Sequence, residues 1–163
     1  MKKKIKAFFF DRDNTLIDDK GYTHKIEQLK FLTGVIKGLQ YLKDNNIRII
    51  VITNQSGIAR GYFKLSDVHN FHKYMNKKLL EKNCKIDDFF ICGCHPNISK
   101  KKCFCRKPNP EMINQAKKKW KLKKSEIIMM GDKKTDKLAS KRAGIKFVYK
   151  KKISLYKQIK NIL

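Results

Sequence analysis

The chain has 163 residues, 41% of them hydrophobic, which is enough for one ordinary domain with a buried core. Its formal net charge of +26 arises from 40 basic and 14 acidic residues, and 35 of the basic residues are lysines. Because base reading and bidentate phosphate binding favour arginine, and because the lysines are spread over the whole chain, the charge indicates a solvated basic surface rather than a dedicated nucleic-acid site.

The N-terminal segment "MKKKIKAFFFDRD" has basic residues followed by apolar ones, as a signal peptide does. Lys6 interrupts the apolar run and Asp11 stops it, so the run is shorter than the ~7–15 residues of a signal peptide's apolar region. No stretch approaches the ~18 apolar residues that a membrane span needs. We therefore expect a cytoplasmic protein, in which free thiols and metal sites outnumber disulfides.

Five apolar segments predict the strands of a parallel sheet, because they are continuous apolar runs without polar alternation. In chain order the predicted strands are 5–10, 47–53, 89–92, 126–131 and 146–150. The first of them runs three phenylalanines directly into Asp11, Arg12 and Asp13. This junction indicates a buried strand whose end delivers two acids to a site.

Helical patterns lie between and after these strands. The predicted helices are 34–45, 67–82, 110–120, 135–143 and 153–162. Ser66 and Asn109 are predicted N-caps, Pro110 is predicted at a first helical position, and Gly144 is predicted to end the helix at 135–143. Strand–helix alternation predicts a three-layer α/β sandwich with a Rossmann-like parallel sheet.

We expect one domain over residues 1–163, since no repeat or linker interrupts the pattern. No long cap insertion separates the segments either, so the site is predicted to be fairly open. In such sheets ligands bind beyond the carboxyl ends of the strands.

Polar residues follow the predicted strands at this edge or precede the helix at 110. They are Asp11, Asp13, Thr53, Asn54, Gln55, Ser56, Arg106, Lys107, Asp132, Lys133 and Asp136. Helix capping explains any one of the acids, but a group of acids repels itself without a cation. Oxygen ligands and a phosphorylated substrate together favour Mg²⁺.

A phosphate ester accounts for the remaining residues of this group. Lys107 and the Thr53 hydroxyl are suited to hold phosphoryl oxygens. Asp11 can attack phosphorus and form an aspartyl-phosphate. Asp13 can protonate the leaving oxygen and then activate water for the second step.

The segments "DRDNT", "TNQSGIARG", "CRKPNP" and "GDKKTD" together resemble the four motifs of the haloacid dehalogenase (HAD) superfamily of phosphatases. The resemblance extends from Lys6 to Tyr149 and implies the sandwich fold predicted above. It implies Asp11 as nucleophile and Asp13 as acid/base. It also implies a Mg²⁺ site of Asp11, the Asp13 main-chain carbonyl and Asp132, with Thr53 and Lys107 stabilising the transferring group.

Within the superfamily the chain is similar to the branch that removes the 7-phosphate of D-glycero-D-manno-heptose 1,7-bisphosphate, in the synthesis of activated heptose for lipopolysaccharide or other surface glycans. "TNQSGIARGYF" and "KPNPEM" favour this branch over the related histidinol-phosphate phosphatases. The implied substrate contacts are Asp19, Lys20, Gly21, Tyr22, Thr53, Asn54, Gln55, Ser56, Arg106, Lys107 and Lys133. The chain departs from the family at Asn14, where glycine is usual, and asparagine best replaces glycine where φ is positive.

Four of the five cysteines, Cys92, Cys94, Cys103 and Cys105, flank a short loop. Paired thiols at this spacing indicate a tetrahedral zinc site, with two disulfides as the alternative. The resembled branch has Cys-x-His followed by Cys-x-Cys, whereas this chain has Cys94 at the histidine position and His95 after it. The ligands are therefore the four thiols, or His95 replaces one. Such a structural Zn²⁺ would rigidify the loop 92–105, which aims Arg106 and Lys107.

Two other functions compete with the sugar bisphosphate phosphatase. One is a histidinol-phosphate phosphatase. The other is a nucleic-acid-binding polynucleotide 3′-phosphatase, which fits the charge but lacks an aromatic-rich basic platform for stacking bases. We expect a monomer, no specific nucleic acid and no membrane partner. The sequence does not distinguish the heptose anomers.

Overall fold

The structure, a computed structural model, describes residues 4–163. Residues 1–3, which begin the predicted domain and the segment compared with a signal peptide, lie outside it. The strands form one five-stranded sheet in the order β3-β2-β1-β4-β5, and every neighbouring pair is parallel. Their bounds are Ala7–Phe10 (β1), Arg48–Asn54 (β2), Asp88–Cys92 (β3), Ile127–Gly131 (β4) and Lys146–Tyr149 (β5). All five predicted strands are confirmed, with small shifts at their ends.

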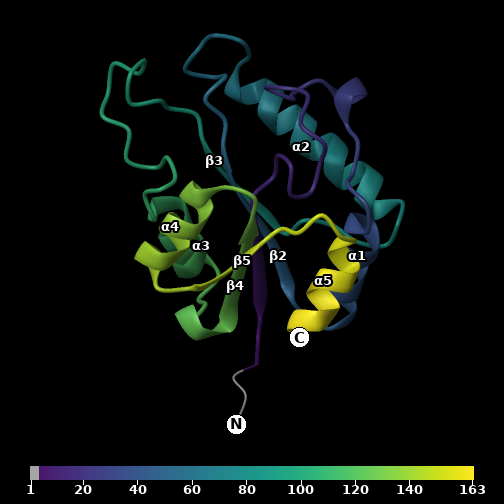
Figure 1. The fold of residues 1–163 in the computed structure, drawn as a ribbon. Coiled ribbons are helices and arrows are strands. Elements are labelled where there is room, and N and C mark those ends of the chain that lie inside the picture. The colour runs from purple at the N-terminus through teal and green to yellow at the C-terminus, as the bar shows by residue number, and fades with distance from the viewer. Residues whose placement is uncertain (1–3) are drawn as a thin grey trace.

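The helices cover both faces of this sheet, as Figure 1 shows. Their bounds are Val35–Asp44 (α1), Leu65–Leu80 (α2), Glu111–Lys119 (α3), Lys134–Ala143 (α4) and Leu155–Ile162 (α5). Two 3₁₀ turns, η1 (Ile26–Gln28) and η2 (Lys124–Glu126), complete the described elements. Helices α1, α2 and α5 pack on one face, while α3 and α4 pack on the other. The predicted three-layer sandwich is therefore confirmed.

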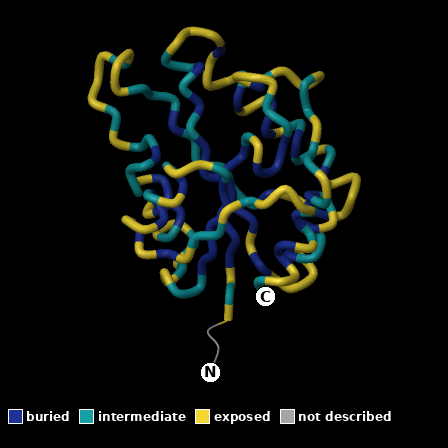
Figure 2. Tube along the Cα trace, viewed as in Figure 1, coloured by how far each residue is buried: buried dark blue, intermediate teal, exposed yellow. Residues whose placement is uncertain are grey.

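The three phenylalanines of β1 explain why this strand lies at the centre of the sheet. Phe8 and Phe10 belong to the core under α1, α2 and α5, whereas Phe9 belongs to the core under α3 and α4. Every residue of β1 is fully buried, and the buried trace runs through the middle of the molecule in Figure 2. An apolar run without alternation is what a strand covered on both faces requires. Its carboxyl end leads directly into Asp11.

All five predicted helices are present, with starts that differ from the predicted ones by one or two residues, and two of the predicted N-caps are wrong. Helix α2 begins at Leu65 after Lys64, because the Asp67 carboxylate accepts the Lys64 main-chain N–H at 2.7 Å and so closes the first turn; Ser66 lies inside the helix. Pro110 is the N-cap of α3 and not its first residue, since its carbonyl already accepts the Asn114 N–H at 2.9 Å; Asn109 lies outside. The predicted end of α4 is confirmed, because Gly144 has a φ of 71°.

The connections at the carboxyl edge carry little regular structure in the described chain. Between β1 and α1 the only regular element is η1, and the cysteine-bearing segment joins β3 to α3. No large cap is inserted in residues 4–163, as the sequence predicted. Asn14, which stands where the family usually has glycine, has a φ of 58°, so the expected positive φ is confirmed. No helix among the described residues is long and apolar enough to cross a membrane.

The last helix is predicted to contribute strongly to stability. Ile159 of α5 is fully buried and packs over Gly38 of α1, and α5 lies beside α1 in Figure 1. Ile159→Ala leaves a cavity and is expected to lower the free energy of unfolding by about 2–4 kcal/mol. Urea denaturation measures the change. The control Lys157→Ala removes an exposed side chain of the same helix, and its effect should stay within about 0.5 kcal/mol; equal effects of the two changes contradict the packing of α5.

Candidate active site

Three strands bring their polar ends together at the carboxyl edge of the sheet. Because β1 lies between β2 and β4, its last residue Phe10 is in register with Val51 on one side and Met130 on the other. Asp11 therefore lies between the ends of β2 and β4. One carboxylate oxygen from each of Asp11, Asp132 and Asp136 lies within 4.8 Å of the others.

The Lys107 ammonium joins this group from the long loop between β3 and α3. It donates to Asp11 Oδ1 at 2.8 Å and to the Ile52 carbonyl at 2.7 Å, and it lies 2.7 Å from Asp136 Oδ1. Only 2% of the residue is exposed. Burial alone lowers the pKa of Lys107, but the Asp11 and Asp136 carboxylates outweigh burial and raise it. Lys107 is therefore a buried ammonium with two carboxylate partners.

The positive charge of Lys107 does not offset the effects of burial and of the neighbouring carboxylates on Asp11. Burial raises the pKa of Asp11 to about 7; Lys107 opposes the shift, while Asp136 and Asp13 add to it. Asp132 Oδ1 is buried and has no hydrogen-bond partner in the described part of the chain. An uncompensated group of buried carboxylate oxygens fits a hard divalent cation, so these residues fit the predicted Mg²⁺ site.

The composition of the acid group differs from the predicted Mg²⁺ ligands. Asp136 belongs to it; the sequence placed this residue at the same edge but not among the Mg²⁺ ligands. Its Oδ2 accepts the Lys133 N–H at 3.1 Å, at the start of α4. The Asp13 carboxylate lies outside the group, which agrees with an expected contribution from its main-chain carbonyl. Gly131 makes room for Asp136, because a Cβ at this position would lie 2.7 Å from Asp136 Cγ.

Gln55 connects Asp13 with Thr53. Its Nε2 donates to Asp13 Oδ2 at 3.1 Å and to Thr53 Oγ1 at 2.9 Å. Gln55 is 3% exposed, and its side-chain amide is bonded to both of these groups. Gln55 thus holds the two candidate catalytic side chains, and its predicted substrate contact stays a prediction.

Asn54 holds the main chain of Lys107. Its Oδ1 accepts the Lys107 N–H at 3.0 Å, and its Nδ2 donates to the Lys107 carbonyl at 3.1 Å. Both ends of the amide are thus used inside the protein. Asn54 fixes where the Lys107 side chain starts, which no local sequence pattern indicates.

The segment from Asp19 to Tyr22, predicted to bind substrate, forms an ordered loop. Asp19 Oδ1 accepts the Gly21 N–H at 3.1 Å and the Thr23 hydroxyl at 2.8 Å, so Asp19 organises the loop. Lys20 pairs with Asp18 at 2.8 Å. Tyr22 is 43% exposed and stacks edge-on against Tyr62 at 4.8 Å, which leaves part of its ring available.

The remaining predicted substrate contacts lie around the same edge, and they differ in exposure and in hydrogen bonding. The Ser56 carbonyl accepts the Arg60 N–H at 3.1 Å, and Lys133 is exposed at the start of α4. Arg106 Nη1 is buried and has no hydrogen-bond partner among residues 4–163. An unsatisfied buried guanidinium nitrogen fits an anionic ligand.

The four loop cysteines form one compact sulfur cluster. The structure joins Cys92 to Cys105 and Cys94 to Cys103 as disulfides, with Cα–Cα distances of 5.5 and 5.7 Å. Sulfurs that are not bonded to each other lie only 3.4–3.9 Å apart. The group that could hold a metal ion contains the four cysteines and not His95, whose Nδ1 accepts the Asn97 N–H at 3.2 Å. The cluster thus fits the predicted metal-binding loop through Cys94.

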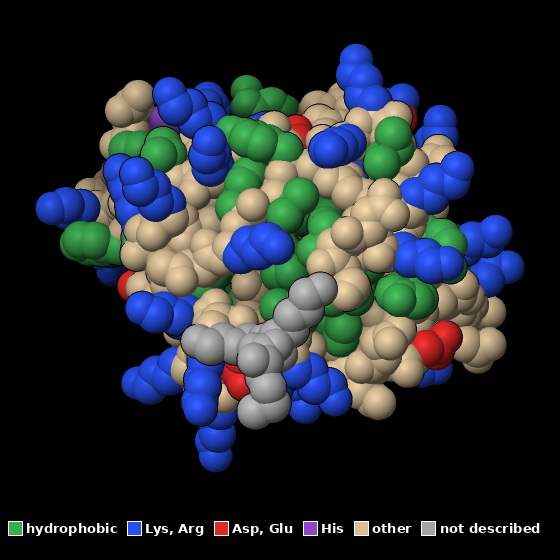
Figure 3. Space-filling view, turned by 60° about the horizontal axis from the view of Figure 1, so that its bottom comes forward, with side chains coloured by type: hydrophobic (Ala, Val, Ile, Leu, Met, Phe, Trp, Pro, Cys, Tyr) green, Lys and Arg blue, Asp and Glu red, His purple; other side chains and the backbone are tan. Residues whose placement is uncertain are grey.

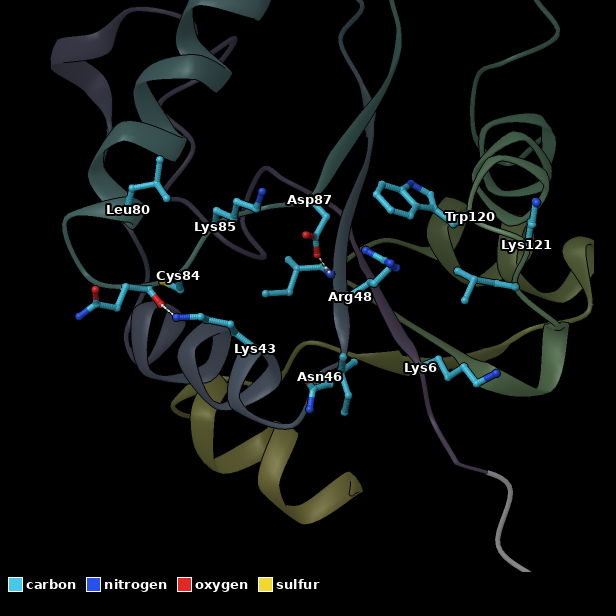
Figure 4. A pocket seen from close by; sticks show the side chains of 14 residues that line it. Lys6, Lys43, Asn46, Arg48, Leu80, Cys84, Lys85, Asp87, Trp120 and Lys121 are labelled. Carbon is cyan, nitrogen blue, oxygen red and sulfur yellow. Dashed lines mark hydrogen bonds between the residues drawn. The ribbon is translucent and has the colours of Figure 1, made fainter.

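A cavity of about 790 Å³ lies away from this edge, at the amino ends of the strands, and contains none of the predicted site residues. Figure 4 shows Lys6, Arg48, Asp87 and Trp120 around it. Figure 3, which brings this end forward, shows lysine and arginine side chains scattered over the visible face rather than gathered in one patch. The basic lining therefore reflects the composition of the whole chain.

Comparisons with known proteins agree with this architecture. A sequence model of the Polynucleotide kinase 3 phosphatase family matches residues 6–155. A solved HAD-like phosphatase from Mesorhizobium loti has a TM-score of 0.80 and 31% identity, covering 87% of this chain and 70% of its own. The chain is thus a phosphatase of the HAD superfamily.

More specific relatives are found in one branch. D-glycero-alpha-D-manno-heptose-1,7-bisphosphate 7-phosphatase of Photorhabdus laumondii is 42% identical over 87% of this chain and 80% of its own. The corresponding beta enzyme of Escherichia coli K12 is 35% identical over 89% and 78%. The D,D-heptose 1.7-bisphosphate phosphatase of B. bronchiseptica, solved with magnesium and phosphate, has a TM-score of 0.80 and 26% identity over 88% and 79%. The chain belongs to the Polynucleotide kinase 3 phosphatase family, and within it these heptose bisphosphate phosphatases are its curated relatives.

The Asn54 clamp predicts a loss of rate without a loss of fold. Asn54→Leu keeps the side-chain volume but removes both hydrogen bonds to the Lys107 main chain. Since a displacement of about 1 Å at a catalytic group can cost roughly 10²-fold, we expect kcat/KM for phosphate release to fall about 10- to 100-fold. Asn114→Leu, on the surface of α3, serves as the control, and thermal unfolding is followed for both. An unchanged kcat/KM in Asn54→Leu shows that Lys107 does not need the clamp.

Proposed function

We propose that the protein hydrolyses the 7-phosphate of D-glycero-D-manno-heptose 1,7-bisphosphate through an aspartyl-phosphate intermediate. The observation that carries the proposal is the convergence of Lys107 with the acid group of Asp11, Asp132 and Asp136 at the carboxyl edge. Gln55 links Thr53 to Asp13 at the same edge. The curated relatives that share most of the chain support the substrate. Their names include both the alpha and the beta anomer, and the anomer used here remains part of the proposal.

The first step forms one bond and breaks another. An Asp11 carboxylate oxygen attacks phosphorus while the bond from phosphorus to the sugar oxygen breaks, and the Asp13 carboxylic acid gives its proton to that oxygen. The products are the sugar alcohol, the Asp11 acyl phosphate and the Asp13 carboxylate. The Lys107 ammonium lies beside Asp11, the Thr53 hydroxyl is linked to Asp13 through Gln55, and both would donate to the phosphoryl oxygens.

The second step restores the enzyme. Water attacks phosphorus, its proton passes to the Asp13 carboxylate, and the bond between phosphorus and the Asp11 oxygen breaks, releasing inorganic phosphate. Asp11, Asp132 and the Asp13 carbonyl would hold Mg²⁺, which neutralises charge on the transferring group when bound. The ordered Asp19–Tyr22 loop, Ser56, Arg106 and Lys133 surround the open edge and recognise the sugar and its second phosphate.

The four cysteines are proposed as a structural zinc site. A tetrahedron with metal–sulfur bonds of about 2.3 Å has sulfur–sulfur edges of about 3.8 Å. The unbonded sulfurs of the cluster are separated by 3.4–3.9 Å, close to such edges. The site requires reduced thiols, so the proposal includes a cytoplasmic location and places Zn²⁺ in the segment leading to Arg106. We also propose that the protein is a monomer and that residues 1–163 form a single domain.

Two other substrates are measured against this proposal. A histidinol phosphate is the substrate of a related branch, and a 3′-phosphorylated oligonucleotide is suggested by the name of the matched family. Identities of 35–42% to heptose bisphosphate phosphatases favour the sugar.

A phosphate-release screen tests the function directly. With Mg²⁺ present, heptose 1,7-bisphosphate is expected to give a kcat/KM at least about 10²-fold above histidinol phosphate or a 3′-phosphorylated oligonucleotide, because the proposed contacts recognise a sugar together with its second phosphate. Asp11→Asn should remove turnover, since an amide does not attack phosphorus, while its thermal unfolding stays near that of the wild type. EDTA should abolish activity and MgCl₂ restore it. A preference for either competing substrate overturns the assignment.

Zinc is tested by elemental analysis of protein purified with reductant and without chelator. About one Zn²⁺ per chain is expected, since four thiolates close one tetrahedral site. Cys94→Ser should lose most of the metal and reduce kcat/KM about 10-fold or more through the loop before Arg106. The matched change His95→Ala should retain the metal. Fully active wild-type protein without zinc identifies the cysteines as disulfide partners instead.

A further inference from the structure

Arg12 stands in sequence between the two candidate catalytic acids, yet neither step above uses it. It is the largest fully buried side chain of the described residues, with an exposed fraction of 0%. Burial of a guanidinium costs several kcal/mol unless hydrogen-bond partners replace its water. The partners of Arg12 therefore indicate why it is buried next to Asp11 and Asp13.

The partners of Arg12 come from four separate parts of the chain. Nε donates to Asp13 Oδ1 at 2.8 Å, and Nη2 donates to the Thr23 carbonyl at 2.7 Å and to Gln55 Oε1 at 3.3 Å. Nη1 lies 3.3 Å from His72 Nε2 in helix α2. The guanidinium also lies over the Phe71 ring, 5.0 Å from its centroid. None of these partners belongs to the acid group of Asp11, Asp132 and Asp136.

These contacts hold both oxygens of the Asp13 carboxylate. Oδ1 accepts from Arg12, and Oδ2 accepts from Gln55, which is itself bound to Arg12 through its other amide atom. The three side chains therefore form a closed ring of hydrogen bonds. A carboxylate held at both oxygens has one orientation, whereas a free aspartate samples several rotamers.

The far side of Arg12 is fixed by His72. An arginine only donates, so His72 Nε2 accepts and the proton of the neutral ring is on Nδ1. Burial, with Arg12 and His69 adding to it, lowers the pKa of His72 to about 2, so the ring stays neutral. His72 stacks on Phe89 with ring centroids 4.1 Å apart. Helix α2 and strand β3 thus hold one end of the arginine while Asp13 holds the other.

We propose that Arg12 is a positioning residue that orients the Asp13 carboxyl group for proton transfer to the leaving oxygen. Through the Thr23 carbonyl, Arg12 also connects this group to the end of the ordered Asp19–Tyr22 loop. The inference rests on the proposed function, in which Asp13 is the acid/base. Arg12 itself contacts neither the phosphoryl group nor the nucleophile. It acts through Asp13, and its loss should be felt only where proton transfer matters.

Esters with different leaving groups distinguish this role from a purely structural one, because only some leaving groups need a proton. An alkyl alcohol leaves from phosphorus only with protonation, whereas p-nitrophenolate leaves without a proton. General acid catalysis contributes typically about 10²–10⁴-fold. Because kcat/KM reports the reaction up to the first irreversible step, it reports phosphoryl transfer to Asp11 and not the later hydrolysis. A structural defect lowers kcat/KM equally for both kinds of ester.

The experiment compares heptose 1,7-bisphosphate with p-nitrophenyl phosphate in the Mg²⁺-loaded enzyme. In Arg12→Gln we expect kcat/KM to fall about 10²-fold for the sugar phosphate and less than about 5-fold for the aryl phosphate. Arg12→Lys keeps the charge but not the fork of donors, so it should recover only part of the loss. Arg48→Gln, which removes a guanidinium stacked on Trp120 at 4.2 Å at the amino end of β2, is the matched control and should change neither value.

Equal losses for the two substrates, or no loss for either, overturn the inference. If Arg12→Gln does not fold, the same comparison in His72→Leu decides, since this change leaves Arg12 in place but frees its far end. There we expect a smaller loss, about 5- to 10-fold, again confined to the alkyl ester, and equal or absent losses reject the role. Failure of the proposed function gives a different result, because wild-type protein would then prefer histidinol phosphate or a 3′-phosphorylated oligonucleotide to heptose 1,7-bisphosphate.

Discussion

The candidate active site is organised around one buried positive charge, the Lys107 ammonium. It contacts Asp11, Asp136 and the Ile52 carbonyl, and so connects strand β2 with the segments after β1 and β4. Breaking a buried pair by removing one partner leaves an uncompensated charge and costs about 3–5 kcal/mol. The acids therefore remain assembled because Lys107 is present, and Lys107 stays in place because Asn54 holds its main chain.

The parts that the sequence predicts well are those governed by local patterns. Continuous apolar runs identified all five strands, and strand ends placed Asp11, Thr53 and Asp132 at one edge of the sheet. The cysteine spacing likewise identified the sulfur cluster. These features depend on short-range rules: burial on both faces, parallel pairing and ligand spacing.

The parts that it did not predict depend on side chains far apart in the chain. Arg12 meets His72 across 60 positions, and Asn54 meets Lys107 across 53. Asp136 caps helix α4 with one carboxylate oxygen, but no local pattern predicted that its other oxygen pairs with Lys107. Asn54 and Gln55, which resemblance assigns to the substrate, also form hydrogen bonds with the candidate catalytic groups. Single-residue patterns do not distinguish these two uses.

The scattered lysines give ionic strength two opposite effects on this protein. With a formal charge of +26, neighbouring ammonium groups repel one another in the folded state, and salt at about 0.1 M screens such repulsion beyond roughly 10 Å. The same screening weakens the long-range attraction of the proposed substrate, a doubly phosphorylated sugar, toward the open edge. Salt therefore makes the fold more durable while it slows the encounter with substrate. Substrate capture is therefore fastest at low ionic strength, whereas the folded state is most stable at higher ionic strength.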